Sequence, residues 1–484
     1  MADEIQTIAF VSLGCPKNLV DSERMLGLLA QDGLTVTRDA GDADAIVINT
    51  CGFLEASKTE SMGEIHRAIR LKEKGKCKRV VVAGCLVQRH KTRLLAEAPG
   101  IDRLVGVFDR DNIVEAVRGN GAGGKEEHFL GKYHDLSRRL ADEAKLDANV
   151  KQTKTTRLAV FEDDRGRLRL TPRHYAYLRL SEGCNQGCAF CTIPSIRGPM
   201  RSKPIDHILA EARELAADGA VELNLIGQDT TSYGTDIGYE PGLAGLLRRL
   251  DREMKDVHWL RLMYAYPSCF TDEMIRAIGE CERVVKYIDM PLQHIEDEML
   301  TVMKRRVTRG QIETLLDKLR KWVPGITIRT TFIAGSPGET QSQHGELVKF
   351  VKEFGFDMMG VFPYSAEPGT PMGRMEGQIA EEVKKARVEE LMLAQQEVAF
   401  GKARGKIGQK VQVLIDKPAG KKGRWTGRTA GQAPEIDSAT IVRGGGLGAD
   451  LHAGMMTSVK VVDSEGYDLV GEVPRPRSLT VVGV

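Results

Sequence analysis

The amino-acid sequence predicts an α/β protein built from three structured parts, and two observations carry this prediction. Short apolar runs alternate with amphipathic stretches over residues 5–120 and again over residues 170–401, which is typical of parallel β-sheets covered by helices. Residues 404–472 are instead rich in glycine, valine and threonine, with short strand patterns, as expected of a small antiparallel β-barrel. A chain of 484 residues is long enough to form several such cores.

The first part, residues 5–120, contains four apolar runs that we predict to be parallel strands: "TIAFVSLG", "AIVINT", "RVVVAG" and "RLVGV". Helix-like segments separate them, so this part is expected to be a doubly wound parallel sheet. Residues 121–169 break the rhythm, since they begin glycine-rich and continue highly charged. We expect them to be a linker with some local structure, including a hairpin in "FEDDRGRLRL" with its turn at residues 164–166.

The second part, residues 170–401, contains six further strand-like runs separated by helical patterns: "HYAYLRL", "VELNLIG", "HWLRLMYA", "VVKYIDMPL", "GITIRTTFIAG" and "DMMGVFPYS". About six strand–helix units fit a partial or complete parallel (β/α) barrel. In the third part, "KVQVLID", "SATIVR", "MMTSVKVVD" and "YDLVGEV" predict the strands of the terminal barrel.

Composition restricts the location and chemistry of the protein. No apolar run approaches the roughly 18 residues of a membrane span, and the N-terminus lacks the features of a secretory signal, so we expect a cytoplasmic protein without membrane contact. In that reducing compartment, the nine cysteines indicate buried thiols, catalysis or metal ligation rather than disulfides. The net charge of +2 does not by itself indicate binding to nucleic acid.

The segment "CNQGCAFC" places Cys184, Cys188 and Cys191 in a C-x3-C-x2-C pattern directly after a predicted barrel strand. Three thiolates from one tight loop can each bind one iron of a four-iron cluster and leave the fourth iron open to another ligand. The alternative is a zinc site, but structural zinc needs four ligands, and the nearest histidine, His174, lies on the far side of the strand.

This spacing, together with Phe190 before the third cysteine and the barrel that follows, resembles the radical S-adenosylmethionine (radical SAM) superfamily. The resemblance implies that the open iron binds the amino and carboxylate groups of S-adenosylmethionine and that one-electron reduction releases a 5′-deoxyadenosyl radical. It also places Phe190, Gln228 of "GQDTTSYG" and Gly335 of "TFIAGSPGE" near this cofactor. For the last two segments, an ordinary turn remains the alternative.

Three isolated cysteines share one topological position in the first part of the chain. Cys15, Cys51 and Cys85 each follow a predicted parallel strand and precede a predicted helix. Strand ends of an open α/β sheet gather at one edge, and helix N-termini favour anions, so the three thiolates are expected to meet and to bind a second cluster. The other cysteines, Cys77, Cys269 and Cys281, share no such position and are interpreted as structural.

The three parts taken together resemble the methylthiotransferases over essentially the whole chain, the terminal barrel being of the TRAM type. The resemblance implies two [4Fe-4S] clusters, with Cys15, Cys51 and Cys85 as ligands of the second. The open iron of that cluster is thought to carry the sulfur that is methylated and transferred. One S-adenosylmethionine then supplies the methyl group, and another supplies the radical that abstracts hydrogen from the substrate carbon.

The family divides mainly between enzymes that modify a tRNA adenosine and one that modifies an aspartate of ribosomal protein S12. Pro16 and Lys17 after the first cysteine are similar to the protein-modifying branch, as is the segment around Glu435 and Asp437. Those two carboxylates are expected to repel RNA phosphates and to suit a basic ribosomal protein. From residue 403 onward, however, twelve Lys or Arg face eight Asp or Glu, so RNA contact by the TRAM domain stays open.

Transfer of a methylthio group to the β-carbon of an aspartate in ribosomal protein S12 is therefore the first hypothesis, with a reductase as electron donor. A tRNA adenosine as the target is the second. A non-enzymatic iron–sulfur sensor that binds RNA is the third.

Overall fold

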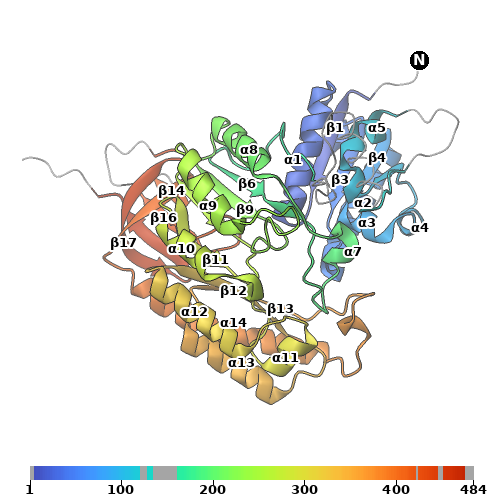
Figure 1. Cartoon of the computed structure of the whole chain (residues 1–484). Helices are drawn as coiled ribbons and strands as arrows, with labels where there is room; N and C mark the ends of the chain where they lie inside the picture. The colour runs from blue at the N-terminus through green and yellow to red at the C-terminus, as the bar shows by residue number, and fades with distance from the viewer. Residues whose placement is uncertain (1–4, 120–127, 134–160, 421–422, 445–450, 475–484) are drawn as a thin grey trace, which may run out of the picture.

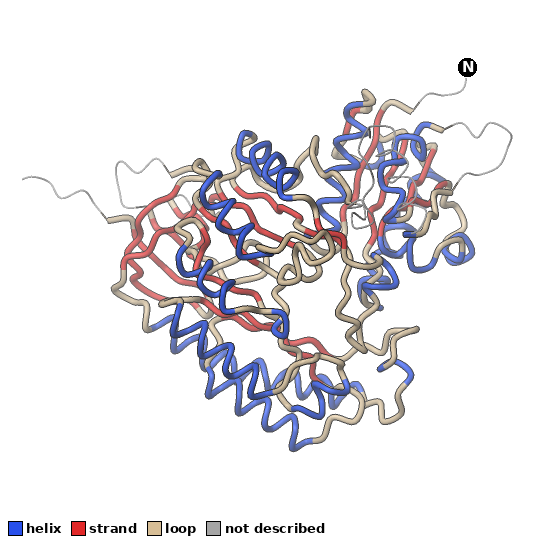
Figure 2. The backbone as a smooth tube through the Cα atoms, in the orientation of Figure 1, coloured by secondary structure: helices blue, strands red, loops and turns tan. Residues whose placement is uncertain are grey.

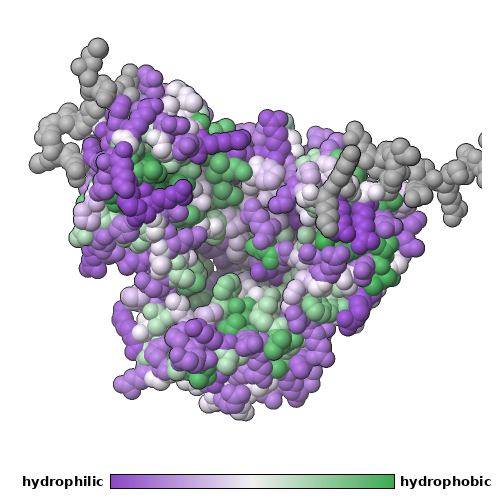
Figure 3. All heavy atoms as spheres, turned by 180° about the vertical axis from the view of Figure 1, so that it is seen from behind, coloured by the Kyte–Doolittle hydropathy of each residue, from purple (hydrophilic) through white to green (hydrophobic). Residues whose placement is uncertain are grey.

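The computed structural model describes residues 5–119, 128–133, 161–420, 423–444 and 451–474. The N-terminal α/β domain lies on one side of a central half-open barrel, and a small β-barrel lies on the other side (Figure 1). Polar and apolar side chains are interspersed on the back face, which is hollowed near its middle (Figure 3). Among the described residues, no helix has the length and apolar character that crossing a membrane requires.

The N-terminal domain is a five-stranded parallel sheet with the strand order β2-β1-β3-β4-β5. The four predicted strands are confirmed, and the two-residue edge strand β2 is an addition to the prediction. Helices α1 and α5 pack on one face of the sheet, and α2 and α3 pack on the other. Each face has its own apolar core, so the sheet is doubly wound. The elements are β1 (Thr7–Ser12), α1 (Pro16–Gln31), β2 (Thr35–Val36), η1 (Ala40–Asp42), β3 (Ala45–Thr50), α2 (Glu55–Lys74), β4 (Arg79–Gly84), α3 (Cys85–His90), α4 (Arg93–Glu97), β5 (Arg103–Val105), η2 (Val107–Asn112) and α5 (Ile113–Arg118).

The central domain is a six-stranded parallel sheet with the order β13-β12-β11-β10-β9-β6, and its helices cover the outer face (Figure 2). All six predicted strands are confirmed. No pairing joins β6 to β13 in the described part of the chain, so the barrel is partial. The elements are β6 (Tyr175–Arg179), β7 (Ser181–Glu182), α7 (Ile193–Arg197), β8 (Arg201–Ser202), α8 (Ile205–Ala217), β9 (Glu222–Ile226), α9 (Gly242–Glu253), β10 (Trp259–Leu262), η3 (Pro267–Cys269), α10 (Asp272–Glu280), β11 (Val284–Asp289), α11 (Asp297–Val302), α12 (Arg309–Trp322), β12 (Thr327–Ala334), α13 (Gln341–Phe354), β13 (Met358–Pro363), η4 (Met372–Arg374) and α14 (Glu381–Arg404).

Strand β6 shows how the barrel separates an apolar outside from a polar inside. Ala176 and Leu178 belong to the large core beneath the covering helices. Tyr175, Tyr177 and Arg179 alternate with them and face the opposite side, because successive side chains of a strand point in opposite directions. The barrel interior therefore carries buried tyrosines and charged groups that are available for chemistry at its carboxyl end.

The terminal domain is a closed barrel of five strands in the order β14-β15-β16-β18-β17. Its strand pairs are antiparallel except for β16 with β18, which are parallel. The four predicted strands are confirmed, and β15 is an addition to the prediction. The strands are β14 (Lys410–Pro418), β15 (Arg424–Arg428), β16 (Thr440–Arg443), β17 (Met456–Glu465) and β18 (Asp468–Glu472).

One loop of this terminal barrel docks against the inside of the central barrel. Asp437 accepts a hydrogen bond of 2.7 Å from the Tyr287 hydroxyl and lies 3.3 Å from Arg329, and its side chain is only 2% exposed. Glu435 accepts hydrogen bonds from the hydroxyls of Tyr175 and Tyr177. The interpretation of this acidic pair as a surface for a basic partner is therefore wrong for Asp437, because its charge is used to join two domains.

The predicted hairpin at residues 164–166 is wrong. Residues 161–170 contain no strand, and the backbone N–H of Leu168 donates to the Glu23 carbonyl of α1 rather than to a second strand. Gly166 supplies the expected bend with φ of +68°. The segment lies between the N-terminal domain and the central barrel, where its polar groups bond to α1 and to the barrel.

Asp164, from this same segment, is the centre of a buried ionic network. Its carboxylate accepts hydrogen bonds of 2.6 to 2.9 Å from Arg110 of the N-terminal domain and from Arg179 and Lys203 of the central domain. Although burial itself raises the pKa of Asp164, the three cations hold it well below its usual value. The network therefore fixes the N-terminal domain against the barrel with charged groups that water does not reach.

Asp164→Asn is expected to lower the free energy of unfolding by about 3–5 kcal/mol, because it leaves buried cations without their counter-charge. Urea denaturation, followed by circular dichroism, measures the shift of the transition. Asp163→Asn is the matched control, since that side chain is 41% exposed and its loss costs at most about 1 kcal/mol. Equal shifts for the two variants would show that the network contributes no more than a surface ion pair.

Candidate cluster-binding site

The segment "CNQGCAFC" forms a loop between β7 and α7, beyond the carboxyl end of the first barrel strand. Backbone N–H groups point at two of its sulfurs: Gln186 donates to Cys184 Sγ at 3.5 Å and Ile193 to Cys191 Sγ at 3.4 Å. Arg305 lies 3.6 Å from Cys188 Sγ through Nη1. The structure thus brings the three predicted cysteines together in one loop and supplies each sulfur with a hydrogen-bond donor.

Side chains from the neighbouring barrel loops hold this loop in place. Gln186, inside the loop, donates at 2.6 Å to Asp229, which follows β9. Asp229 in turn accepts from the hydroxyls of Thr231 and Ser232, both at 2.6 Å. Asp229 therefore works as a support for the cysteine loop, whereas the sequence had left open whether it was a turn residue.

Cys15, Cys51 and Cys85 also come together, at the carboxyl ends of the adjacent strands β1, β3 and β4. The backbone is so close here that a Cβ added to Gly14 would lie 2.8 Å from the Cβ of Cys51. One added to Gly52 would lie 2.7 Å from the Cα of Leu86, next to Cys85. Both glycines are required by this close approach, and the predicted convergence of the three thiols is what the fold produces.

Arg197 connects the two cysteine groups. It is the last residue of α7, which directly follows the barrel loop, and it donates to Cys85 Sγ from Nε at 3.3 Å and from Nη2 at 3.1 Å. The same guanidinium pairs with Asp21 at 2.8 Å and Glu182 at 3.0 Å. A second contact joins the loops, because Thr192 donates to the Phe53 carbonyl at 3.4 Å. The two groups therefore face each other across the domain boundary.

The chemistry of these sulfurs fits two iron–sulfur clusters. Burial raises the pKa of the Cys85 and Cys191 thiols to about 12 and that of Cys184 to about 11, so iron must displace their protons. The N–H donors around the sulfurs then match the anionic thiolates that a cluster requires. Within the described ranges, no group of three His, Cys, Asp or Glu side chains is close enough together to hold a single metal ion. A four-iron cluster does not need such a group, because each thiolate binds a separate iron.

The residues predicted to lie near S-adenosylmethionine occupy three different positions. Phe190 packs against Met303 and Tyr364 in a small apolar cluster beside the cysteine loop. Gln228 donates to Glu182 through its amide nitrogen, while its amide oxygen is buried without a hydrogen-bond partner. Gly335 has φ of +77°, and a Cβ there would lie 2.4 Å from the side chain of Lys384. The close approach of helix α14 is therefore sufficient reason for a glycine at this position.

Four residues at the site were not singled out by sequence reasoning: Arg197, Gln186, Arg305 and Tyr266. Arg305 lies over the Tyr266 ring, 4.0 Å from its centroid, and the Tyr266 hydroxyl is 3.5 Å from Cys188 Sγ. Gln186 also donates at 3.3 Å to Cys269 Sγ, so this cysteine, interpreted as structural, lies beside the loop. No sequence signal marks these residues, because their partners are distant along the chain.

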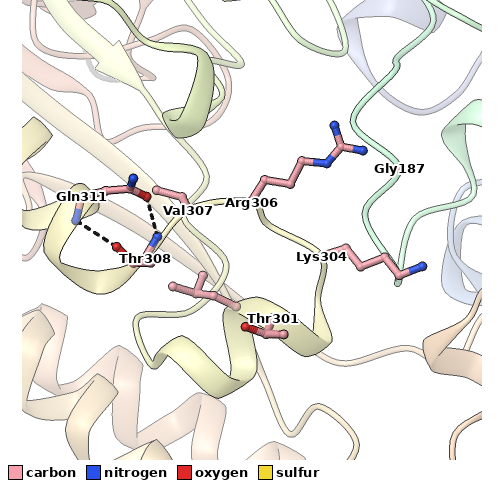
Figure 4. Close-up of a pocket in the computed structure, with 8 residues that line it drawn as sticks. Gly187, Thr301, Lys304, Arg306, Val307, Thr308 and Gln311 are labelled. Atoms are coloured by element: carbon pink, nitrogen blue, oxygen red, sulfur yellow. Dashed lines mark hydrogen bonds between the residues drawn. The ribbon is translucent and has the colours of Figure 1, made fainter.

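The turn between α11 and α12 presents two cations beside the barrel cysteine loop. Lys304 and Arg306 have φ of +55° and +50°, an uncommon backbone for residues other than glycine. This conformation turns both side chains outward while Arg305 points inward to Cys188. They line a cavity of about 490 Å³ that also includes Gly187 of the cysteine loop (Figure 4).

Comparison with known proteins agrees with this architecture. Residues 7–106 match the uncharacterized protein family UPF0004, residues 178–351 the radical SAM superfamily and residues 407–473 the TRAM domain. The superfamily match means that the central barrel uses S-adenosylmethionine and a [4Fe-4S] cluster. Among solved structures, the radical S-adenosylmethionine methyltransferase TsrM from Kitasatospora setae has a TM-score of 0.52 at 16% identity, covering 76% of this chain and 77% of that one, which shows a shared fold.

Curated relatives match over nearly their whole length. A ribosomal protein uS12 methylthiotransferase RimO from Desulforamulus reducens is 42% identical over 96% of this chain and 99% of its own. The RimO protein of Geobacter sulfurreducens is 39% identical over 98% of this chain and 100% of its own. The chain therefore belongs to the RimO family of radical SAM methylthiotransferases.

Proposed function

We propose that this protein transfers a methylthio group to the β-carbon of an aspartate in ribosomal protein uS12. The observation that carries the proposal is the pair of three-cysteine groups that face each other across the domain boundary, joined by Arg197. Relatives that match nearly the full chain are named ribosomal protein uS12 methylthiotransferases. We take the working parts to be the N-terminal domain (5–120), a linker (121–169), the radical SAM core (170–401) and the TRAM domain (404–472).

In this proposal the enzyme holds two [4Fe-4S] clusters, one on Cys184, Cys188 and Cys191 and the other on Cys15, Cys51 and Cys85. When bound, the barrel cluster would supply an electron to S-adenosylmethionine, and the open iron of the second cluster would carry the sulfur that is transferred. The protein's own contribution is positioning, because Arg197 fixes Cys85 relative to the barrel and Asp229 fixes the barrel loop through Gln186. Contacts across the domain boundary, from Arg197 to Cys85 and from Thr192 to the Phe53 carbonyl, would hold the two cysteine groups on either side of one substrate site.

Separate incubations of the reconstituted enzyme with uS12 and with tRNA, each with S-adenosylmethionine and a reductant, test the substrate. Mass spectrometry of the products is expected to find a methylthio group on the uS12 aspartate and none on the tRNA. A methylthio group found on tRNA alone would contradict the proposal and support the alternative, in which the target is a tRNA adenosine. If uS12 is the substrate, the only RNA that the TRAM domain is expected to contact is the ribosomal RNA next to uS12. The net positive charge of the terminal barrel permits that contact.

The electron for the barrel cluster is proposed to come from an acidic reductase that docks on Lys304 and Arg306. These exposed cations flank Gly187 of the cysteine loop (Figure 4). A donor bound there would therefore lie against the cluster that this loop is proposed to hold. Opposite charges on two partners accelerate their encounter and fix its orientation.

Replacing both residues, Lys304→Glu with Arg306→Glu, is expected to slow reduction by an acidic protein donor about tenfold at low salt. The difference should shrink as salt is added, because the exposed charges are screened. Stopped-flow absorbance of the cluster measures the rate. Dithionite is the control, since a small reductant needs no docking surface and should reduce both proteins equally. Equal rates with the protein donor would place electron entry elsewhere.

A further inference from the structure

Lys17 is a buried cation for which the protein supplies no carboxylate. It is the second residue of α1, two positions after Cys15, and only 7% of it is exposed. Its ammonium lies 3.2 Å from the centre of the Tyr264 ring, at the carboxyl end of β10. In the described part of the chain, no ion pair joins Lys17 to an Asp or Glu oxygen, and the groups that favour its charge against burial are Tyr264, Cys15 and Glu182. Burying a charge without a carboxylate in contact is costly.

The other buried polar residues of α1 are all engaged. Asn18 accepts from Arg197 at 3.2 Å, Asp21 pairs with Arg179 and Arg197 at 2.8 Å, and Glu23 accepts from the backbone of Leu170 at 2.9 Å. Tyr264 gives Lys17 a cation–π contact and one side-chain hydrogen bond. Lys17 thus differs from these neighbours, because no carboxylate of the described residues forms an ion pair with it and its three N–H donors exceed what the Tyr264 hydroxyl can accept.

Two carboxylates of the surrounding segments, Asp289 and Glu182, already pair with arginines. Asp289 accepts from Arg329 at 2.7 Å and from the backbone N–H of Tyr264 at 3.1 Å. Glu182 pairs with Arg197 and Arg179. Neither forms an ion pair with Lys17, although, against the effect of burial, the charge of Glu182 helps to raise the pKa of its ammonium. Tyr264, moreover, is held at φ of +60°, a strained backbone for an aromatic residue that places its ring beneath the ammonium.

We propose that Lys17, over the Tyr264 ring, is a binding subsite for the side-chain carboxylate of the target aspartate. This inference rests on the proposed function. In an aspartate the carboxylate is bonded directly to the β-carbon, so an ammonium that holds one end fixes the reacting carbon beside the Cys15 group. A nucleobase has no carboxylate, so the same contact selects a protein substrate over RNA. The carboxylate of S-adenosylmethionine has the same chemistry and is the competing source.

A double-mutant cycle separates these two sources. The reconstituted full-length enzyme and its Lys17→Met variant are titrated with two uS12 peptides, one with the target aspartate and one with asparagine in its place, by isothermal titration calorimetry. In the parent enzyme, asparagine is expected to weaken binding at least about 30-fold. In Lys17→Met the aspartate peptide should bind as weakly as the asparagine peptide, and the affinity for S-adenosylmethionine should be unchanged.

Three further measurements make the result specific. Lys17→Arg keeps the charge and should recover part of the aspartate preference, whereas Lys349→Met on the exposed face of α13 should change nothing. Iron content and circular dichroism verify that each variant is folded and carries both clusters. An unchanged aspartate preference in Lys17→Met, or a loss confined to S-adenosylmethionine binding, would overturn the subsite. The proposed function fails separately, if the parent enzyme modifies tRNA and not uS12.

Discussion

Cys184→Ala is expected to abolish cleavage of S-adenosylmethionine, with 5′-deoxyadenosine falling to the level of a reaction without enzyme. The loop offers three sulfurs, and each would bind a different iron, so loss of one leaves the barrel cluster without a complete attachment. The backbone of the loop should persist, because Gln186 and Asp229 hold it independently of the Cys184 sulfur. Chromatography of the anaerobic reaction, after reduction with dithionite, measures the product.

Cys281→Ala is the matched control for this change. Its sulfur is buried in the apolar core under the barrel helices, away from the loop, so the variant should lose some stability and keep its activity. If Cys184→Ala still released 5′-deoxyadenosine at the parent rate, the assignment of this loop to the barrel cluster would be wrong.

Cys15→Ala is expected to separate the two halves of the reaction. Cleavage of S-adenosylmethionine should continue, because Cys15 belongs to the N-terminal domain, while methylthiolated uS12 should no longer form. Iron content is expected to fall by about half, from two four-iron clusters to one. Mass spectrometry of uS12 and quantification of 5′-deoxyadenosine from the same reaction give both readouts.

The comparison for this variant is Cys77→Ala, in the same domain. Cys77 lies in the apolar core on the α2 side of the sheet, so its loss should leave the iron content and both products in place. Methylthiolated product from Cys15→Ala would contradict the second cluster, even if the iron content had fallen.

The convergence of Cys15, Cys51 and Cys85 was predictable because it depends only on strand order in a parallel sheet. Each thiol ends a recognisable strand, and neighbouring strand ends meet whatever the loops do. Arg197 was not predictable, since it lies 112 residues from Cys85 in the sequence. Its role depends on how two domains dock, which no local pattern records.

The two wrong predictions have a common physical origin. In "FEDDRGRLRL" the alternation of residues reflects contacts with α1 and with buried cations, not a partner strand. Asp437 stands in a polar loop that resembles exposed surface, but it is buried against Tyr287. In both cases, a charged residue serves an internal boundary between domains. A charged segment looks the same in the sequence whether it faces solvent or another domain. The two cases can be told apart only when the opposing domain is known.

The ionic network around Asp164 limits how the domains of this protein can be exchanged in engineering. Asp21 and Arg110 come from the first domain, Asp164 from the segment after it, and Arg179 from the barrel. A chimera whose first domain lacks Asp21 or Arg110 would leave buried charges of the barrel unmatched. The N-terminal domain and the barrel of this protein should therefore be exchanged together, although they look like separate modules.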